Sequence, residues 1–402
     1  MITRKRVLRT DGSLWQHLRA PRVPYRRLTQ DQHADVLIVG SGITGAMIGE
    51  ALSAVGFDTV IVDRRGPAQG STTASTALVQ YEIDTPILEL QQKIGKQNAV
   101  RAWRRSRLAV TSLHAFFGGR GFAAQPRDAL YLAGNNLGPR DLQRECELRQ
   151  AAGLESLFLA RKALRERFGI DHGGALMGFG NTTINPREIT ARMLMRAQDF
   201  GARLYAPVDI VDVSRVRSSI VAIDRNGRRI RAKYLVLASG YEFPKMVPAK
   251  GHKVRTTWAF ATAPQPRKLW PEQCMIWEAS TPYLYARTTP DGRVLCGGED
   301  ADASDKLDRP EVIERKVARL QAKIGRLFPK LDTTPEFTWA ARFGETSTGL
   351  PMIGEVPGHR NCWAALGYGG NGITYSRIAA EIIRSALTGE SDPDADLYAF
   401  KR

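Results

Sequence analysis

The clearest hydrophobic pattern of the chain lies between residues 36 and 62. Two uninterrupted apolar runs, VLIV at 36–39 and VIV at 60–62, are rich in β-branched residues, which is typical of strands buried on both faces. Between them, residues 43–56 place apolar side chains at helical spacing and end in Gly56, a common helix stop. The pattern predicts a strand, a helix and a second strand parallel to the first.

Further along, the pattern alternates between one long helical stretch and several strand-like stretches. Residues 87–117 have helical spacing. The pair Asn226-Gly227 predicts a tight hairpin turn that leads into a strand ending at Gly240.

Three more stretches, at 254–264, 282–288 and 293–300, predict an antiparallel sheet, and the turn residues at 290–292 join the last two. Near the end of the chain, the segment GYGGNGITYS at 367–376, as a helix start, offers a row of free N–H groups and the positive end of a helix dipole.

Three glycines stand between the first strand and the first helix with the spacing G-x-G-x-x-G. Gly40 permits a tight turn, Gly42 lets the backbone approach a pyrophosphate, and Gly45 lets the helix pack closely on the strand. Asp63, at the end of the second strand, can accept hydrogen bonds from ribose hydroxyls. The complete unit predicts dinucleotide binding, with the phosphates at the helix N-terminus.

The segment that follows favours FAD over a nicotinamide cofactor. A nicotinamide domain would continue with alternating strands and helices. Instead, residues 64–82 form a loop of small and hydroxyl side chains, RRGPAQGSTTASTALVQYE. Such a loop suits a flat ring that passes close to the backbone, and it lies where an extended FAD would run on from its pyrophosphate.

Composition adds few constraints beyond a soluble globular class. The 402 residues suffice for two domains, 43% are apolar, and no stretch reaches the ~18 apolar residues of a membrane span. No signal-peptide pattern opens the chain, and the four cysteines are scattered without a nearby histidine. We expect a cytoplasmic protein without metal or disulfides.

Charge is the unusual property, since 58 Lys and Arg against 41 Asp and Glu give +17. Part of the excess lies in residues 1–29, where eight basic residues, Arg4 among them, accompany a single acid, Asp11. The simplest interpretation is a solvated basic arm; an organellar transit peptide is disfavoured because the segment is poor in Ser and carries two prolines. A polyanionic partner stays open: peripheral membrane contact through the arm is admissible, and nucleic acid is disfavoured because the arm lacks interleaved aromatics.

The motifs together resemble the D-amino-acid-oxidase-like FAD oxidoreductases, the group of glycine oxidase, sarcosine oxidase and γ-glutamylputrescine oxidase. The likeness runs through most of residues 34–402. It implies a mixed α/β and α+β fold: a discontinuous Rossmann-like FAD-binding domain and a substrate domain built on an antiparallel β-sheet. We expect the FAD domain at 30–90, 180–245 and 340–402, and the substrate or cap domain at 91–179 and 246–339.

The motifs and the resemblance together assign a set of residues to FAD. These are Gly40, Ser41, Gly42, Ile43, Thr44, Gly45, Asp63, Arg64, Gly70, Ser71, Thr72, Thr73, Thr76, Ala77, Leu78, Val208, Ser239, Gly240, Gly367, Gly369, Gly370, Asn371, Gly372 and Ile373. Residues 201–213 resemble the family's strand whose backbone, here around Val208, contacts the adenine. Residues 339–383 resemble the family's closing unit of a strand, a glycine turn and the last helix. The start of the last helix matches the segment that faces the flavin's pyrimidine oxygens, where it would stabilise the reduced ring.

For the substrate, the strongest candidate is Arg342 in WAARFG, because a planar guanidinium binds a carboxylate through two parallel hydrogen bonds. Glycine-oxidase-like sequences carry their carboxylate-binding arginine at the matching place. Tyr285 and Arg287 on a substrate strand, with Tyr283 beside them, and Tyr368 at the last helix are further catalytic candidates. No general base is evident.

Two departures from the family bear on the chemistry. The attachment cysteine of sarcosine-oxidase-like members is replaced here by Ala341 and Arg342, and residues 64–90 contain no histidine, so we expect non-covalent FAD. The lysine that activates oxygen in those members matches Leu295 here. The electron acceptor is therefore open between O₂ and a quinone or other carrier.

The favoured function is oxidation of a small amino acid or secondary amine by hydride transfer to FAD, with hydrolysis of the imine. One alternative keeps the fold and changes the substrate to a 2-hydroxy acid, glycerol phosphate or a γ-glutamylated polyamine. Another is of a different class: a flavoprotein module associated with RNA or a membrane. The sequence leaves the exact substrate, its stereochemistry and the oligomeric state open.

Overall fold

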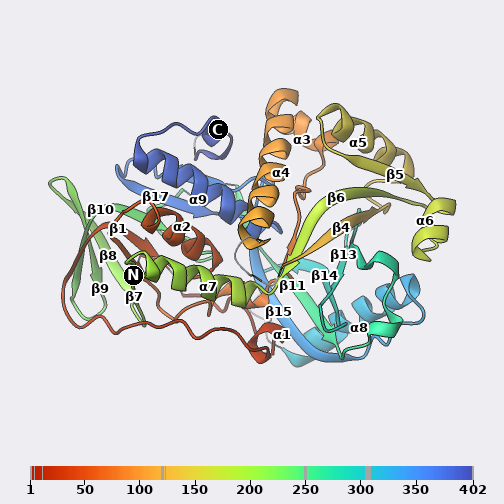
Figure 1. Ribbon diagram of the computed structural model, residues 1–402, viewed down its shortest axis with the longest axis horizontal. Coiled ribbons are helices and arrows are strands. Elements are labelled where there is room, and N and C mark those ends of the chain that lie inside the picture. The colour runs from red at the N-terminus through yellow and green to blue at the C-terminus, as the bar shows by residue number, and fades with distance from the viewer. Residues whose placement is uncertain are drawn as a thin grey trace.

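The computed structural model describes residues 2–3, 5–10, 12–118, 122, 124–248, 251–303 and 309–400. Two β-sheets, each with its own helices, form two lobes that lie side by side (Figure 1). The structure is therefore a mixed α/β and α+β protein of two layers per lobe, as the sequence predicts.

The first sheet is built around five parallel strands in the order β17-β10-β1-β2-β7. Strand β16 pairs antiparallel with β17 at one end, and the β8–β9 hairpin pairs with β10. The bounds are β1 Gln32–Val39, β2 Thr59–Val62, β7 Arg203–Tyr205, β8 Ile210–Val216, β9 Ser219–Asp224, β10 Arg229–Leu237, β16 Met352–Glu355 and β17 Cys362–Leu366.

Three helices lie along this sheet: α2 Ile43–Ser53, α7 Pro186–Asp199 and α9 Gly372–Thr388, and α2 packs against the other two (Figure 1). The predicted strand–helix–strand unit is thus β1, α2 and β2, and its two strands are parallel. The Asn226-Gly227 hairpin is also present, because Gly227 adopts φ +81° and donates its N–H to the carbonyl of Asp224 at 3.0 Å.

The second sheet has the order β15-β11-β14-β13-β12-β4-β6-β3, with β5 on β6. All its neighbours are antiparallel except β12 and β4. The bounds are β3 Leu78–Val79, β4 Ala124–Leu132, β5 Ser156–Ala160, β6 Gly174–Ile184, β11 His252–Thr262, β12 Met275–Glu278, β13 Leu284–Thr288, β14 Val294–Asp302 and β15 Pro335–Thr346.

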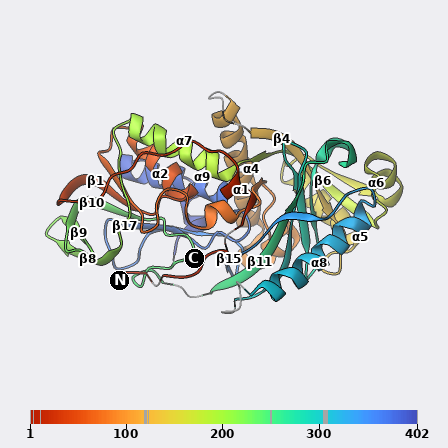
Figure 2. The ribbon, with the colours of Figure 1, turned by 90° about the horizontal axis from the view of Figure 1, so that it is seen from below.

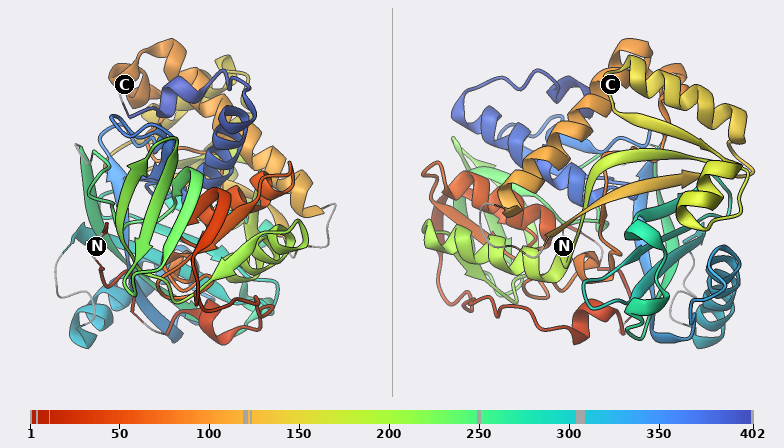
Figure 3. Two further views of the ribbon diagram at one scale, coloured as in Figure 1. Left: turned by 90° about the vertical axis from the view of Figure 1, so that its left-hand side faces the viewer. Right: turned by 45° about the vertical axis from the view of Figure 1, so that its right-hand side comes forward.

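Helix α8, Pro310–Leu327, packs on the β11, β13, β14 and β15 part of this sheet, while α5 Pro139–Ala151 and α6 Arg161–Phe168 pack on β5 and β6 (Figure 1). Helix α4, Lys96–Gly118, contacts α9 of the first lobe and β4 and β6 of the second, and it lies at their junction (Figures 1 and 3). This helix therefore packs on both lobes.

Two predicted elements are divided in the structure. The helical stretch 87–117 forms α3, Ile87–Ile94, and α4, because Gly95 adopts φ +83° between them. The predicted strand 201–213 is split into β7 and β8 around the bond Ala206-Pro207, since proline offers no N–H to a strand ladder. The predicted domain limits at 180 and 340 fall inside β6 and β15, both strands of the second sheet.

The described part of residues 1–29 packs on the protein, although five of its basic residues, Lys5, Arg19, Arg22, Arg26 and Arg27, are exposed as expected for a solvated basic segment. Trp15, in the short helix α1 Leu14–His17, is 2% exposed and donates its Nε1 hydrogen to the carbonyl of Ser75 at 2.6 Å. Isolated β-bridges join Thr3 to Pro244 and Arg9 to Ala341. The segment therefore runs against the body of the protein, as the dark red trace in Figure 2 shows; Arg4 and Asp11 lie outside the described residues.

Candidate active site

The glycine turn between β1 and α2 leaves no space for side chains. A Cβ on Gly40 would lie 2.3 Å from the carbonyl oxygen of Ala238, and Gly40 has φ +117°. A Cβ on Gly45 would lie 1.8 Å from the carbonyl oxygen of Gly40. The tight turn and the close packing of helix on strand therefore both require glycine, for the reasons read from the sequence.

Asp63 holds this turn from the end of β2. Its Oδ2 accepts the N–H of Ser41 at 2.8 Å, and its Oδ1 accepts the N–H groups of Arg65 and Gly66 at 2.7 and 3.1 Å. A carboxylate can accept about four hydrogen bonds, so Oδ2 keeps capacity for a ligand hydroxyl.

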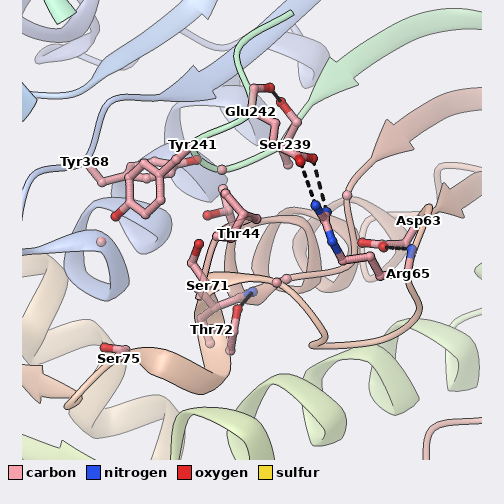
Figure 4. A pocket seen from close by; sticks show the side chains of 18 of the residues that line it. Thr44, Asp63, Arg65, Ser71, Thr72, Ser75, Ser239, Tyr241, Glu242 and Tyr368 are labelled. Atoms are coloured by element: carbon pink, nitrogen blue, oxygen red, sulfur yellow. Dashed lines mark hydrogen bonds and ion pairs between the residues drawn. The ribbon is translucent and has the colours of Figure 1, made fainter. Parts of the chain in front are cut away.

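A first pocket opens over the start of α2. It is lined by Thr3, Leu8, Val39, Gly40, Gly42, Ile43, Thr44, Asp63, Arg64, Arg65, Gly70, Ser71, Thr72, Ser75, Ala238, Ser239, Gly240, Tyr241, Glu242, Tyr368, Gly370, Gly372 and Ile373. Thr72 Oγ1 accepts the N–H of Ile43 at 3.1 Å, which ties the hydroxyl-rich loop to the first turn of the helix. Figure 4 shows Ser71 and Thr72 near Thr44, with Tyr241 and Tyr368 beside them.

One end of the first pocket carries an ion cluster around Glu242, which is 3% exposed. Its carboxylate pairs with Arg65 at 2.6 Å and Arg64 at 3.3 Å, and it accepts the backbone N–H of Arg6 at 2.6 Å. The Arg6 contact therefore ties the N-terminal segment to this cluster. Figure 4 shows Arg65 of the cluster beside Asp63. Sequence reasoning missed Glu242 and Arg65, because their partners are distant in the chain.

A second pocket continues from the first and lies between the start of α9 and the second sheet. It is lined by Ser71, Ala74, Ser75, Thr76, Ala77, Leu78, Gln80, Asp84, Tyr241, Thr257, Trp277, Tyr283, Tyr285, Ala341, Arg342, Phe343, Gly369, Gly370, Asn371 and Ile373. Ser71, Ser75, Tyr241, Gly370 and Ile373 line both pockets. The two pockets therefore form one elongated site.

The start of α9 is fastened to the loop at residues 80–84. Asn371 Nδ2 donates to the carbonyl of Glu82 at 2.6 Å, and Thr374 Oγ1 donates to the carbonyl of Gln80 at 2.9 Å. The N–H of Gly370 donates to Asp84 Oδ2 at 2.7 Å. Gly369, Gly370 and Asn371 thus line the second pocket, and a carboxylate of the chain itself already accepts the N–H of Gly370.

Arg342 lies in the second pocket, as predicted from its motif. It is 8% exposed, on β15, and its backbone N–H donates to the carbonyl of Leu8 at 2.8 Å. Trp339 Nε1 donates to the carbonyl of Ala74 at 2.9 Å, which fixes β15 against the hydroxyl-rich loop. Both anchors hold the strand that carries the guanidinium.

The tyrosines divide between the two pockets. Tyr285 and Tyr283 line the second pocket; the Tyr285 hydroxyl is 3.2 Å from Thr257 Oγ1, and the Tyr283 hydroxyl donates to Asp300 Oδ2 at 2.7 Å. Burial raises the pKa of both tyrosines, so they are neutral hydrogen-bond donors at pH 7. Tyr368 lines the first pocket and donates to the carbonyl of Ala365.

Arg287 and Leu295 do not line either pocket. Arg287 is 2% exposed, and its Nη1 donates to the carbonyls of Ala77 at 2.7 Å and Ile184 at 3.0 Å. Burial lowers the pKa of Arg287 to about 9. The structure therefore corrects the candidate catalytic role: Arg287 supports the loop at Ala77 from beneath. Leu295 packs in the core with Trp339, so it cannot stand over a ligand.

The predicted cofactor residues lie mostly along this site. Those that line neither pocket are Ser41, Gly45, Thr73, Val208 and Gly367. Val208 is buried and donates its N–H to the carbonyl of Asp63 at 2.8 Å. Asp84 lines the second pocket but was not predicted from the sequence. Its position, just after the hydroxyl-rich loop, could have indicated it.

The site fits an extended dinucleotide with a flat ring. A Cβ on Gly42 would lie 3.1 Å from Thr72 Oγ1 in the first pocket, and a Cβ on Gly370 would lie 3.0 Å from Asp84 Oδ1 in the second. Glycine at these two positions therefore leaves room in each pocket for a ligand. The first-turn N–H groups of α2 suit phosphates. In the described ranges, no helix is long and apolar enough to cross a membrane, and no metal-binding cluster of His, Cys, Asp and Glu occurs.

Comparison with known proteins gives relatives over most of the chain. The bifunctional tRNA 5-methylaminomethyl-2-thiouridine biosynthesis protein MnmC of Cupriavidus necator is 25% identical over 409 residues, which cover 91% of this chain but only 59% of that protein. The chain thus spans little more than half of this relative. γ-Glutamylputrescine oxidoreductase of Escherichia coli is 23% identical, covering 92% of this chain and 87% of that enzyme.

Solved structures agree with the fold. Glycine oxidase from Geobacillus kaustophilus superposes with a TM-score of 0.75 at 19% identity, covering 92% of this chain and 99% of that one. L-Proline dehydrogenase from P. horikoshii gives 0.78 at 16% identity, with 92% and 98% covered. L-α-Glycerophosphate oxidase from Mycoplasma pneumoniae, solved with FAD bound, gives 0.74 at 16% identity, with 92% and 98% covered.

The sequence model of the family described as FAD dependent oxidoreductase matches residues 35–386, from the first parallel strand to the last helix. This range contains the glycine turn, Asp63, the hydroxyl-rich loop and Arg342. The chain belongs to the D-amino-acid-oxidase family of FAD-dependent oxidoreductases.

Proposed function

We propose that this enzyme oxidises a small amino acid or secondary amine that carries a carboxylate. The observation that carries the proposal is Arg342, a guanidinium inside the second pocket and beside the loop where a flavin ring would lie. FAD, when bound, supplies the hydride acceptor. The relatives named for glycine oxidase and γ-glutamylputrescine oxidation support a C–N bond as the site of oxidation.

The chain's own residues would bind and orient the substrate. Arg342 would hold the carboxylate through two parallel hydrogen bonds, which fixes the α-carbon relative to the ring. The neutral hydroxyls of Tyr283 and Tyr285 would complete the polar wall, while Trp277 and Phe343 exclude water. The imine product then hydrolyses to an oxo compound and an amine.

FAD would be held without a covalent bond. Asp63 would accept ribose hydroxyls, the start of α2 would face the pyrophosphate, and the loop at 71–78 would border the ring. Acid precipitation of the purified protein should release the flavin into the supernatant. Flavin that stays in the pellet would contradict the non-covalent attachment, and a folded protein with no affinity for FAD would contradict the assignment of these pockets.

The substrate class is tested by an anaerobic stopped-flow screen in which bleaching of the flavin reports hydride transfer. We expect an amino acid or an N-substituted amino acid to bleach the flavin, and simple uncharged amines to fail. Hydroxy acids and glycerol phosphate belong in the same screen, because bleaching by these compounds alone would transfer the assignment to an alcohol-oxidising enzyme.

A second candidate substrate is an amine carried on RNA. The relative named for tRNA modification and the net charge of +17 favour this test. Binding of bulk tRNA should then weaken steeply as salt rises, since phosphate contacts release counterions. If tRNA binds no more tightly than a non-nucleic polyanion such as heparin, this candidate is excluded.

A further inference from the structure

Asp84 and Arg342 both line the second pocket, and among the described residues that line it they are the carboxylate and the guanidinium. Asp84 lies in the loop between β3 and α3. Its side chain is accessible to solvent through the open pocket, while protein atoms crowd around it on the other sides. The Gly370 N–H holds its Oδ2 at 2.7 Å. The carboxylate keeps capacity for further hydrogen bonds on its pocket side.

The surroundings of Asp84 favour a cation next to it. Burial raises the pKa of Asp84 to about 6, the N–H of Gly370 opposes this, and the carboxylates of Asp300 and Glu345 raise the pKa again. The group is therefore charged at pH 7 and is a stronger base than an ordinary aspartate. A positive charge beside it would relieve the repulsion from Asp300 and Glu345.

Aromatic side chains complete the same part of the pocket. Tyr241, Trp277, Tyr283 and Tyr285 line it, and the negative charge of Asp84 acts on the hydroxyls of Tyr241 and Tyr283. Aromatic faces attract cations through their quadrupoles, and the attraction grows where water is excluded. A carboxylate in a pocket lined by several aromatic rings is thus suited to an alkylammonium group.

We propose that Asp84 binds the substrate's ammonium group and accepts its proton, while Arg342 binds the carboxylate. The inference rests on the proposed function and makes it more specific, since the pocket would select zwitterionic amino acids over carboxylates and hydroxy acids of the same skeleton. Asp84 thereby supplies the base that the sequence left unassigned.

The proton and electron balance is complete with FAD as the oxidant. The ammonium nitrogen gives one proton to Asp84 and regains its lone pair. The α-carbon hydrogen leaves with its bonding electrons to FAD, and the nitrogen lone pair forms the C=N bond of a protonated imine. Asp84 later returns its proton to solvent or to the departing amine.

The test compares two ligands in the holoenzyme with Asp84→Asn, which keeps the size of the side chain and an acceptor for the Gly370 N–H. One ligand is the amino acid that bleaches the flavin fastest; the other is the carboxylic acid of the same skeleton without the amine. Both measurements are made without oxygen. Binding of the amine-free acid is measured from the change that it causes in the flavin spectrum, and binding of the amino acid from the bleaching of the flavin at equilibrium. The matched control is Asp302→Asn, whose side chain is 89% exposed and pairs with Arg255 at 2.7 Å.

We expect Asp84→Asn to weaken amino-acid binding by about 10-fold or more, as the loss of a charge-assisted contact should, and to leave binding of the amine-free acid unchanged or tighter. The rate of flavin reduction at saturating amino acid should fall with decreasing pH through about 6 in the wild type. This decrease of the reduction rate at low pH should be absent in Asp84→Asn and present in Asp84→Glu and Asp302→Asn.

Equal loss of both ligands in Asp84→Asn would assign Asp84 a structural role and overturn the inference, as would unchanged binding of the amino acid. The proposed function can be contradicted separately. If hydroxy acids alone bleach the wild-type flavin, both the proposed function and the role of Asp84 are wrong. If amino acids bleach wild type and Asp84→Asn with the same affinity and pH profile, only the role of Asp84 is wrong. Normal flavin content and retained binding of the amine-free acid show that the variant is folded.

Discussion

Glu242 and Arg65 form an ion pair of 2.6 Å at one end of the first pocket, and the same carboxylate accepts the backbone N–H of Arg6. One buried side chain therefore joins the glycine-turn region to the N-terminal segment. Thr3 and Leu8 of that segment line the first pocket, and the Leu8 carbonyl accepts the N–H of Arg342. The segment expected to be a free arm is part of the site.

Glu242→Gln should loosen this segment. The amide keeps an acceptor but removes the charge that Arg64 and Arg65 face, and a charged hydrogen bond of this kind contributes about 1.5–3 kcal/mol. We expect trypsin to cleave within residues 5–10 several-fold faster, as followed by mass spectrometry. Asp171→Asn, which breaks an exposed pair with Arg161, should leave the cleavage rate unchanged. Equal rates in wild type and Glu242→Gln would contradict the role of Glu242.

Sequence reasoning succeeded where neighbours in the chain determine the structure. The glycine turn at Gly40 and Gly45 depends on contacts within one strand–helix–strand unit, and Asp63 completes it from the next strand. Apolar patterning likewise predicted the two parallel strands β1 and β2. These features are local, so a single sequence carries them.

Reasoning from the sequence failed where long-range packing decides. Tyr285 and Arg287 lie two positions apart on β13, so both side chains leave the same face of the sheet. Tyr285 reaches the second pocket, whereas Arg287 is covered by distant segments whose Ala77 and Ile184 carbonyls accept its hydrogen bonds. The N-terminal segment pairs with β15 through Arg9 and Ala341. Asp84 meets Gly370 at the start of α9, 286 positions further along the chain. No periodicity within the chain signals such contacts.

Arg342→Ala tests the carboxylate anchor. A charge-assisted pair of hydrogen bonds contributes about 2–4 kcal/mol, so KM for the best amino acid should rise roughly 30–1000-fold while the flavin spectrum stays intact. Arg255→Ala is the matched control, because Arg255 lies on β11 of the same sheet and pairs with Asp302 instead of lining the pocket. An unchanged KM in Arg342→Ala would mean that the substrate has no carboxylate at this position.

His252 should make the protein less stable in mild acid. Burial, and then the charge of Arg6, lower the pKa of His252 to about 4, and its ring lies 3.9 Å from that of Phe243. An unfolded histidine titrates near 6.5, so between pH 6.5 and 4 the unfolded state binds more protons and the free energy of unfolding falls as pH decreases. The stability that depends on this group is complete above pH 6.5.

Urea unfolding of the FAD-saturated protein at several pH values measures this effect. His252→Phe, which keeps the ring contact with Phe243, should flatten the decrease between pH 6.5 and 4. His359→Phe tests whether another histidine would do the same; it lies on an exposed turn before β17, so its removal should leave the slope unchanged. A slope that is identical in wild type and His252→Phe would contradict the assignment.

The last prediction concerns the electron acceptor. The family lysine that activates oxygen matches Leu295, and Leu295 is buried in the core with Trp339, so its position cannot supply a cation above the flavin. Among the described residues that line the second pocket, Arg342 is the permanently charged cation, and a bound carboxylate would neutralise it. Superoxide formed during reoxidation by O₂ is an anion, and an active site stabilises it through a nearby positive charge. We therefore expect the reduced enzyme to react more slowly with air-saturated buffer than with a quinone or an artificial dye of equal concentration, when each is mixed in a stopped-flow instrument. The difference should be greater with the amine-free carboxylic acid bound, because the ligand occupies Arg342. Fast reoxidation by O₂ that is insensitive to this ligand would contradict the prediction and would require a cation from outside the second pocket.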